Sequence, residues 1–400
     1  MTRLRDQLVG LLRRGCFGGP VPGADAGAVG VDSGALGADL GAVDWDGLCA
    51  LACREGLAGL LVSAVRRLRL DVAPDHLAVL GEQAVRTAAR NTHLRAQLAR
   101  IAGYFERCGV DLMALKGIVL IDQLYGRSQL RPMGDVDVMV RPEQLDAACA
   151  ALQRLGCHSG PPLLRGDFFP RYYNERTYMS PGPCPVKLDV HVRPFRPNWY
   201  RRRVPDDALW PACTTILIDG APVRVASLER QLIHLVVHAA IHGAKRLLWL
   251  MDIALFVRRH GDRIDWGRLA DLTVAWGLHH PVRTGLAAVQ QQFGPIVPDR
   301  ARRRLRVGRV GLMDRLVLWH APRDAAHPVS TVMVELLSIR GLSPRVGYLG
   351  ALIRPQPAHL AGLYNGRHVG WQLFATVRRV LRPLARVLRR AWQRRAGGVA

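Results

Sequence analysis

Two long parts of the chain carry apolar residues at the three- and four-residue spacing of amphipathic helices. Residues 44–108 form the first part and predict helices over 44–70 and 75–108. The second part predicts four helices, over 227–243, 246–260, 266–277 and 280–293. Residues 300–395 also have a helical pattern. Prolines interrupt this last region, at Pro322, Pro328, Pro344, Pro355 and Pro357.

Between the helical parts, apolar and polar residues alternate as they do in strands. The alternation predicts strands over 110–115 (VDLMAL), 134–140 (GDVDVMV) and 186–192 (VKLDVHV), and a weaker one over 168–179. Helices are expected over 118–125 and from Pro142 to Gly156. The pattern therefore predicts an α+β protein, with a small sheet core flanked by N-terminal and C-terminal helical regions.

The same pattern divides the chain into five regions. Residues 16–43 are rich in Gly and Ala without a period, which predicts a flexible loop. The expected regions are an N-terminal segment containing this loop (1–43), N-terminal helices (44–108), the α/β core (109–226), a helical domain (227–300) and a basic helical C-terminal region (301–400).

Composition narrows the class of protein. An apolar content of 49% is ample for a globular core. No run approaches the ~18 uninterrupted apolar residues that would predict a membrane span, and the N-terminus lacks a signal-peptide pattern. The eight cysteines are scattered and form no C-x-x-C pair. We therefore expect reduced thiols in a cytoplasmic protein, without a zinc cage.

The charge is high and unevenly distributed. The formal net charge is +24, from 53 arginines but only three lysines. Residues 301–400 contain 19 arginines against three acidic residues, which accounts for +16 of the total. Such a basic end favours an anionic partner, either nucleic acid or an acidic membrane, so a peripheral position at a membrane is also open.

Residues 371–395 concentrate this charge in one segment. Apolar residues recur there near helical spacing, with arginines between them and Pro383 as an expected kink. Such a helix can lie on an acidic membrane or bind nucleic-acid phosphates. The alternative is a solvated arginine face over a packed apolar one, and both interpretations stay open.

Three aspartates occupy alternating positions in two predicted strands. Asp135 and Asp137 lie in GDVDVMV, and Asp189 lies in VKLDVHV. Side chains two residues apart share a strand face, and carboxylates held that close repel unless a cation lies between them. Mg²⁺ takes oxygen ligands, and two such ions can hold the attacking and leaving oxygens of an in-line displacement. The pattern predicts a metal site at these aspartates; a solvated or salt-bridged strand face is the alternative.

The stretch LKGIVLIDQLYG predicts a site for phosphate. It places a strand end, Lys116, Gly117 and a helix start in succession. Glycine lets the backbone approach a ligand, and a helix start offers N–H groups to an anion. Arg131 could bind a phosphate bidentately. Gly117 could instead only form a turn. His191 shares the strand face of Asp189. It either binds phosphate or relays a proton, or it only forms hydrogen bonds on a half-exposed face.

These segments, taken in order, resemble the nucleotidyltransferase superfamily that includes DNA polymerase beta. More closely, they are similar to the bacterial family of uncharacterised nucleotidyltransferases. That family shares an L-K-G element, an R-x-x-x-D-[IV]-D strand, a later [DE]-x-H strand and a downstream helical block. The resemblance covers about residues 44–300. It implies a polymerase-beta-like core and Mg²⁺-dependent transfer of a nucleoside monophosphate. The expected donor is a nucleoside triphosphate such as ATP, and the acceptor a peptide, protein or small molecule.

The resemblance also implies metal-binding and catalytic roles. Asp135 and Asp137 match the metal-binding pair, for one or two Mg²⁺ ions that Mn²⁺ can replace. Asp189 matches the third carboxylate, as a metal ligand or as the base for the acceptor hydroxyl.

Further positions match the nucleotide-binding part. Lys116, Gly117 and Arg131 would bind the triphosphate, with His191 as an auxiliary residue. The superfamily more often has Gly-Ser where this chain has Lys116-Gly117, followed by Ile118. Two further hypotheses therefore stay open: phosphoryl transfer by the same residues, and an inactive nucleotide-binding or interaction module. A transferase acting on nucleic acid through the basic C-terminus is a third.

A histidine stripe is the last candidate. His234, His238 and His242 lie four residues apart on a predicted helix, with Asp252 as a possible further ligand. Histidines at this spacing can bind zinc. A stripe of hydrogen-bonded histidines is the favoured interpretation. A third interpretation is that the histidines line the active-site cleft. Trp249 and its apolar neighbours are expected in the core.

Overall fold

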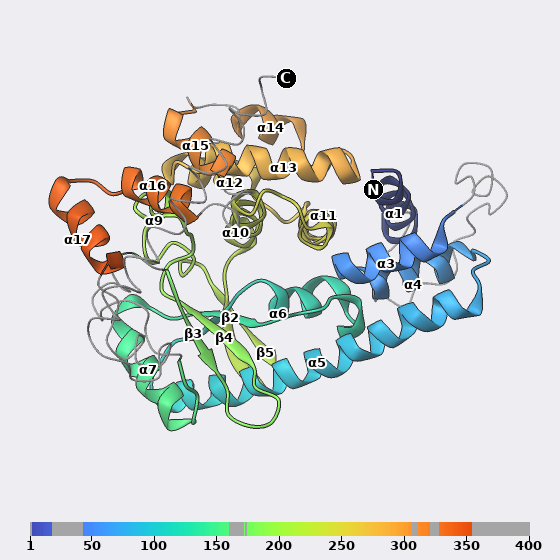
Figure 1. The fold of residues 1–400 in the computed structure, drawn as a ribbon, viewed down its shortest axis with the longest axis horizontal. Coiled ribbons are helices and arrows are strands. Elements are labelled where there is room, and N and C mark those ends of the chain that lie inside the picture. Colours follow the sequence, from blue (N-terminus) through green and yellow to red (C-terminus); the bar gives the residue numbers. More distant parts are fainter. Residues whose placement is uncertain are drawn as a thin grey trace, which may run out of the picture.

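The computed structural model describes residues 2–17, 43–159, 172, 174–305, 310–320 and 328–353. Most of the expected flexible loop (18–42) and the arginine-rich segment 371–395 lie outside these residues. Figure 1 shows the described part: a sheet is flanked by N-terminal helices on one side and covered by C-terminal helices above.

The sheet has six strands in the order β3-β4-β2-β1-β6-β5. β2 is parallel to β4, and β1 is parallel to β6, whereas the other neighbouring pairs are antiparallel. The strands are β1 (Met113–Ala114), β2 (Val136–Met139), β3 (Glu175–Met179), β4 (Lys187–His191), β5 (Thr214–Ile218) and β6 (Ala221–Val225). The prediction of an α+β fold with a small mixed sheet is therefore confirmed.

Four of these strands match the predicted ones, but the β5–β6 hairpin was missed. Its turn carries a readable signal, because Asp219-Gly220 is a dipeptide preferred where both central residues have positive φ. Here φ is 49° at Asp219 and 83° at Gly220. β6 then pairs with β1 and completes the sheet on the side away from the aspartate strands.

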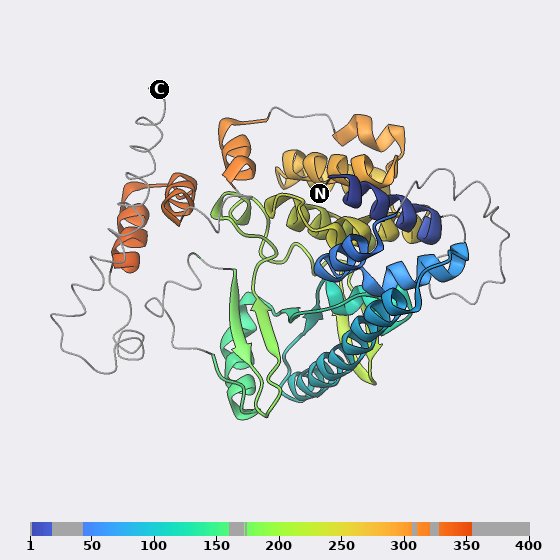
Figure 2. The same cartoon turned by 45° about the vertical axis from the view of Figure 1, so that its right-hand side comes forward.

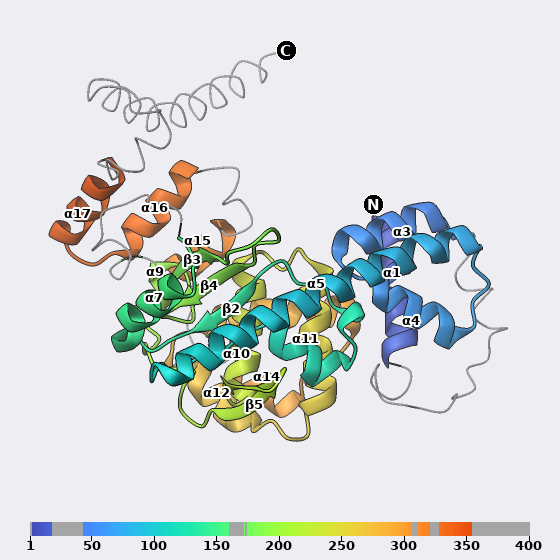
Figure 3. The ribbon, with the colours of Figure 1, turned by 90° about the horizontal axis from the view of Figure 1, so that it is seen from below.

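Four helices of the described residues precede the sheet: α1 (Thr2–Phe17), α3 (Trp45–Glu55), α4 (Ala58–Leu68) and α5 (Pro74–Arg107). α1 was not predicted, yet it packs on α4 and reaches α13, where Phe17 and Phe293 have ring centroids 5.7 Å apart (Figure 2). α5 runs from this bundle to the underside of the sheet (Figure 3). Its first half is buried with the N-terminal helices through Leu80, and its second half with the sheet through Leu98.

The segments between the strands follow the predictions closely. The helix expected over 118–125 is a single α-turn, α6 (Gly117–Leu120), followed by a π-helical turn (Ile121–Tyr125). α7 (Leu145–Arg154) follows a 3₁₀ turn that begins at Pro142, and Gly156 ends it in the left-handed conformation.

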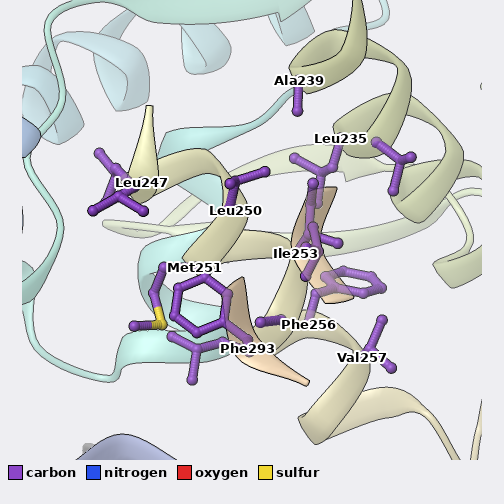
Figure 4. Close-up of a cluster of buried hydrophobic side chains, with 14 of the residues drawn as sticks. Leu235, Ala239, Leu247, Leu250, Met251, Ile253, Phe256, Val257 and Phe293 are labelled. Atoms are coloured by element: carbon purple, nitrogen blue, oxygen red, sulfur yellow. The ribbon is translucent and has the colours of Figure 1, made fainter. Parts of the chain in front are cut away.

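The helical block contains the four predicted helices: α10 (Leu228–Ile241), α11 (Leu247–His260), α12 (Trp266–Ala275) and α13 (His279–Phe293). Figure 4 shows part of their shared core, including Met251, Phe256 and Phe293. Met251 and Phe256 are fully buried, and each such side chain stabilises the fold by about 1.5–3 kcal/mol. This core packs α10 against α11 and α13.

Shorter helices complete the described part. They are α9 (Asn198–Arg201), α14 (Asp299–Leu305), α15 (Leu312–His320), α16 (Pro328–Ser338) and α17 (Leu342–Ile353). α16 contacts α9, and α17 is tied to residue 172, whose tyrosine hydroxyl donates to the Pro344 carbonyl at 2.8 Å. Within the described residues, no helix is both long and apolar enough to cross a membrane.

Candidate active site

The strand register places the three aspartates on one wall of a cleft. Asp137 of β2 lies directly opposite Asp189 of the parallel strand β4. Asp135 precedes β2 and lines the same cleft, which has a volume of about 330 Å³. The exposed fractions of the three side chains are 40% for Asp135, 13% for Asp137 and 9% for Asp189. The convergence that the sequence predicted is therefore present.

Two lysines form ion pairs with these carboxylates. Lys187 Nζ lies 2.6 Å from Asp189 Oδ2 and 3.3 Å from Asp135 Oδ2. Lys116 Nζ lies 2.9 Å from Asp137 Oδ1. The chain has only three lysines, and two of them are used here. The aspartates thus converge and are also salt-bridged, so the two interpretations of the strand are not exclusive.

The surroundings move the pKa values of the first two aspartates in opposite directions. Burial raises the pKa of the Asp137 carboxyl, but Lys116 and His191 outweigh it and hold this pKa well below its usual value. Burial and the charge of Asp137 raise the pKa of Asp135, against the effect of Lys187. Burial also lowers the pKa of Lys116, but nearby carboxylates, Asp137 first, raise it overall. Asp137 therefore carries a firm negative charge.

The predicted phosphate turn is tightly constrained. Lys116 has φ 51° and ψ −126°, a conformation that costs a non-glycine residue free energy and that is found most often at functional sites. A Cβ atom at Gly117 would collide with the guanidinium of Arg131. Gly117 is therefore more than a turn former, because only a residue without a side chain lets Arg131 lie against this backbone.

Arg131 lies in the cleft, but not with the free guanidinium that the sequence suggested. Its Nε and Nη2 atoms donate to Asp252 Oδ1 and Oδ2 at 3.0 and 2.8 Å. Tyr125 adds a 2.6 Å hydrogen bond to Asp252 Oδ1. Asp252 takes the Nε–Nη2 edge of the guanidinium, so a phosphate would meet Arg131 through Nη1, and the role of Arg131 in phosphate binding stays a prediction. Nη1 is the nitrogen that remains beside Gly117.

His191 is buried rather than half-exposed, with 3% of its side chain accessible. Its Nε2 lies 2.9 Å from Asp137 Oδ1, and its Nδ1 lies 3.3 Å from Glu175 Oε2. Asn174 and Glu175 line the same cleft. The sequence did not identify these two residues, because the weak strand pattern over 168–179 gave no sign that they would lie beside His191.

The opposite wall of the cleft comes from the helical block. His238 and His242 of the α10 end face Trp249 of α11, with ring centroids 4.8 and 5.4 Å from the indole. Arg246 lies over the same ring at 5.2 Å. Trp249 was predicted in the core, but it is only half-buried and lines the cleft. An aromatic, basic wall thus faces the carboxylates.

The histidine stripe does not form a zinc site. His234 packs on Phe195, while the other two histidines line the cleft. Asp252 is occupied by Arg131, as described above. Burial, followed by the charge of Lys116, lowers the pKa of His234 to about 3. Among the described residues no group of three or more His, Cys, Asp or Glu side chains has the geometry of a preformed metal site.

The chain is similar to known proteins. The model of a family described as uncharacterised nucleotidyltransferase matches residues 41–294, which is more than half of the chain. This match confirms the family resemblance of the sequence. A search of the curated proteins finds no match. One similar solved structure is that of an antigenic nucleotidyltransferase-like protein from Paracoccidioides brasiliensis. It is 15% identical, covers 52% of this chain and 96% of its own, and has a TM-score of 0.33.

Proposed function

The chain belongs to the family of uncharacterised nucleotidyltransferases, and from this premise we propose that its cleft transfers a nucleoside monophosphate group from a nucleoside triphosphate to an acceptor hydroxyl. The observation that carries the proposal is the register of β2 and β4. It sets Asp137 opposite Asp189, with Asp135 lining the same cleft.

A divalent cation fits the carboxylate wall. Asp135 and Asp189 already share a single ammonium group, that of Lys187, so both point at one position suited to positive charge. Their oxygens are the ligand class that Mg²⁺ prefers. Asp135, Asp137 and Asp189 would hold the ion, which when bound would offset the charge of the phosphates. Lys187 has 43% of its side chain exposed, so it has room to leave these carboxylates.

The donor would lie between the two walls. Lys116, with its raised pKa, remains an ammonium and stabilises phosphate charge. Arg131 Nη1 beside Gly117 contributes one further donor. The aromatic wall of His242 and Trp249 offers a stacking surface for the base.

The acceptor would approach from the β4 side. Asp189 accepts hydrogen bonds from Thr177 (2.6 Å) and Lys187 (2.6 Å), which fix the orientation of its carboxylate. It would take the proton of the acceptor hydroxyl. The acceptor oxygen then forms a bond to the α-phosphorus, the bond from that phosphorus to the bridging oxygen of the β-phosphate breaks, and pyrophosphate leaves with the electron pair.

The experiment is transfer of label from ATP to components of a cell extract, with Mg²⁺ present. Label from the α-phosphate position supports nucleotidyl transfer. Label from the γ-position alone would mean phosphoryl transfer and would overturn the proposal. Absence of transfer, together with nucleotide binding unchanged by Asp135→Ala and Asp137→Ala, would identify an inactive module. Lys187 and Lys116 give this last alternative its basis, because they already neutralise the carboxylates.

A further inference from the structure

A second hollow has a volume of about 650 Å³. We call this hollow the arginine pocket, because its lining includes Arg201, Arg202, Arg203 and Arg340, together with Trp199. Its lining residues come from α9 and from the junction of α16 and α17, and α16 packs against α9 (Figure 1). We propose that the arginine pocket binds a phosphate group of the acceptor, an inference that rests on the proposed function because it assigns the class of acceptor.

The pocket holds like charges close together. The guanidinium carbons of Arg202 and Arg203 lie 4.4 and 3.9 Å from the ring centroid of Trp199. Burial, then the charges of Arg340 and Arg203, lower the pKa of Arg202. Repulsion of this kind is relieved when an anion binds between the arginines.

Part of the charge in the pocket is already compensated, and part is not. Arg203 donates to Asp314 at 3.0 Å, and Arg201 donates to Asn198 Oδ1 at 2.9 Å. Among the residues that the structure describes, neither Arg202 nor Arg340 has an ion-pair partner, and no carboxylate lines the pocket. Guanidinium forks match phosphate oxygens, so these two side chains are the recognition groups.

The position of the pocket points to the acceptor rather than to the donor. The chain leaves β4 after His191 and reaches the pocket at Asn198. On the way Arg196 lines the cleft, only two residues before Asn198. Two residues span at most about 7 Å, so the segment that lines the cleft at Arg196 continues directly into the wall of the pocket at Asn198. A molecule with a phosphate in the pocket can therefore extend its hydroxyl towards the proposed base.

The size of the pocket favours a small phosphorylated molecule over a nucleic-acid strand. Its volume lies within the range of small-molecule sites, about 300–1,000 Å³. A strand would instead require a groove that continues across the surface, with bases stacked along it.

The test measures binding of inorganic pyrophosphate by calorimetry, with the cleft saturated by Mg²⁺ and a non-hydrolysable ATP analogue. Arg202→Gln/Arg340→Gln removes the two recognition groups. The matched control, Arg154→Gln/Arg300→Gln, removes two exposed arginines elsewhere and so lowers the net charge equally. We expect the pocket variant to weaken binding by at least about tenfold, because two charge-assisted hydrogen bonds are lost. The control should stay within about twofold, since isolated surface charges contribute little.

Several results would overturn the proposal. Equal losses in both double variants would mean a bulk charge effect, and an unchanged pocket variant would mean that pyrophosphate binds elsewhere. Complete displacement of pyrophosphate by the ATP analogue would place it in the donor site. Binding of a short RNA that depends on Arg202 and Arg340, without binding of pyrophosphate, would identify a nucleic-acid surface.

The result is separable from the fate of the proposed function. If α-label is never transferred but pyrophosphate binding depends on Arg202 and Arg340, the nucleotidyl-transfer proposal fails and an anion pocket remains. If transfer occurs and the pocket variant binds pyrophosphate normally, the assignment of the acceptor fails alone.

Discussion

The buried pair of Arg131 and Asp252 gives the sharpest prediction for stability. Arg131 is 6% exposed and Asp252 is 2% exposed, and Arg131 donates two hydrogen bonds to the carboxylate. Asp252→Ala would leave a guanidinium buried without its counter-charge. It would also remove the acceptor of the Tyr125 hydroxyl, which donates at 2.6 Å.

The magnitude follows from these contacts. Removing one partner of a buried ion pair costs about 3–5 kcal/mol. The orphaned Tyr125 hydroxyl costs about 1–3 kcal/mol on its own, but the two losses share one carboxylate and do not add fully. We expect Asp252→Ala to lower the free energy of unfolding by about 4 kcal/mol, a large part of the ~5–15 kcal/mol typical of folded proteins.

The assay is urea unfolding followed by far-UV circular dichroism. The double variant Arg131→Met/Asp252→Leu is the control, because it removes both charges and fills similar volume. It should recover the part of the lost stability that comes from the unpaired buried charge, since replacing a buried pair by apolar residues is often neutral, while the Tyr125 hydroxyl still lacks its acceptor. The reasoning is refuted if Asp252→Ala costs less than about 1 kcal/mol, or if the double variant is as unstable as Asp252→Ala.

Three further predictions concern pH, the turn and the metal site. The pKa of His234 is lowered in the folded state to about 3, so the unfolded chain binds more protons below its ordinary pKa, and stability falls as the pH drops below about 6.5. Between about pH 6.5 and about pH 5, the free energy of unfolding should fall by about 1.5 kcal/mol less in His234→Gln than in the wild type, measured by urea unfolding at each pH. The same dependence of the free energy of unfolding on pH in both proteins would contradict this. Gly117→Ala should destabilise by about 1–3 kcal/mol in the same assay because its Cβ meets Arg131, and a neutral result would mean that Arg131 moves aside at no cost. Lys187→Met should tighten Mn²⁺ binding by about two- to fivefold in a paramagnetic resonance titration, since the competing ammonium is gone, whereas Lys245→Met should change nothing; weaker binding in Lys187→Met would sink the idea.

Much of the fold was predictable because its signals are local. The helical block follows from apolar spacing within each helix, and α11 and α12 begin and end within two residues of their predicted bounds. Asp265 caps α12 by accepting a hydrogen bond from the Arg268 amide, a contact between residues only three positions apart. The β5–β6 hairpin was not predicted, although the turn dipeptide Asp219-Gly220 is also a local signal.

The electrostatics of the site were less predictable because they depend on distant pairings. Arg131 and Asp252 are 121 residues apart in the sequence, and only the packing of α11 on the segment before β2 brings them together. The apolar side chain of Trp249 predicts burial, yet this residue lies near the start of α11 and lines the cleft. The position of the aspartates was predicted correctly, because a two-residue spacing in adjacent parallel strands fixes their shared face.

The most direct test of the proposed function compares the rate of α-phosphate label transfer from ATP in the wild type and in Asp137→Asn. Asparagine keeps the shape of the side chain but removes the charge between Lys116 and His191. The proposal predicts a loss of at least about 100-fold, with Asp146→Asn, an exposed carboxylate on α7, unaffected. Transfer at the wild-type rate in Asp137→Asn would contradict it.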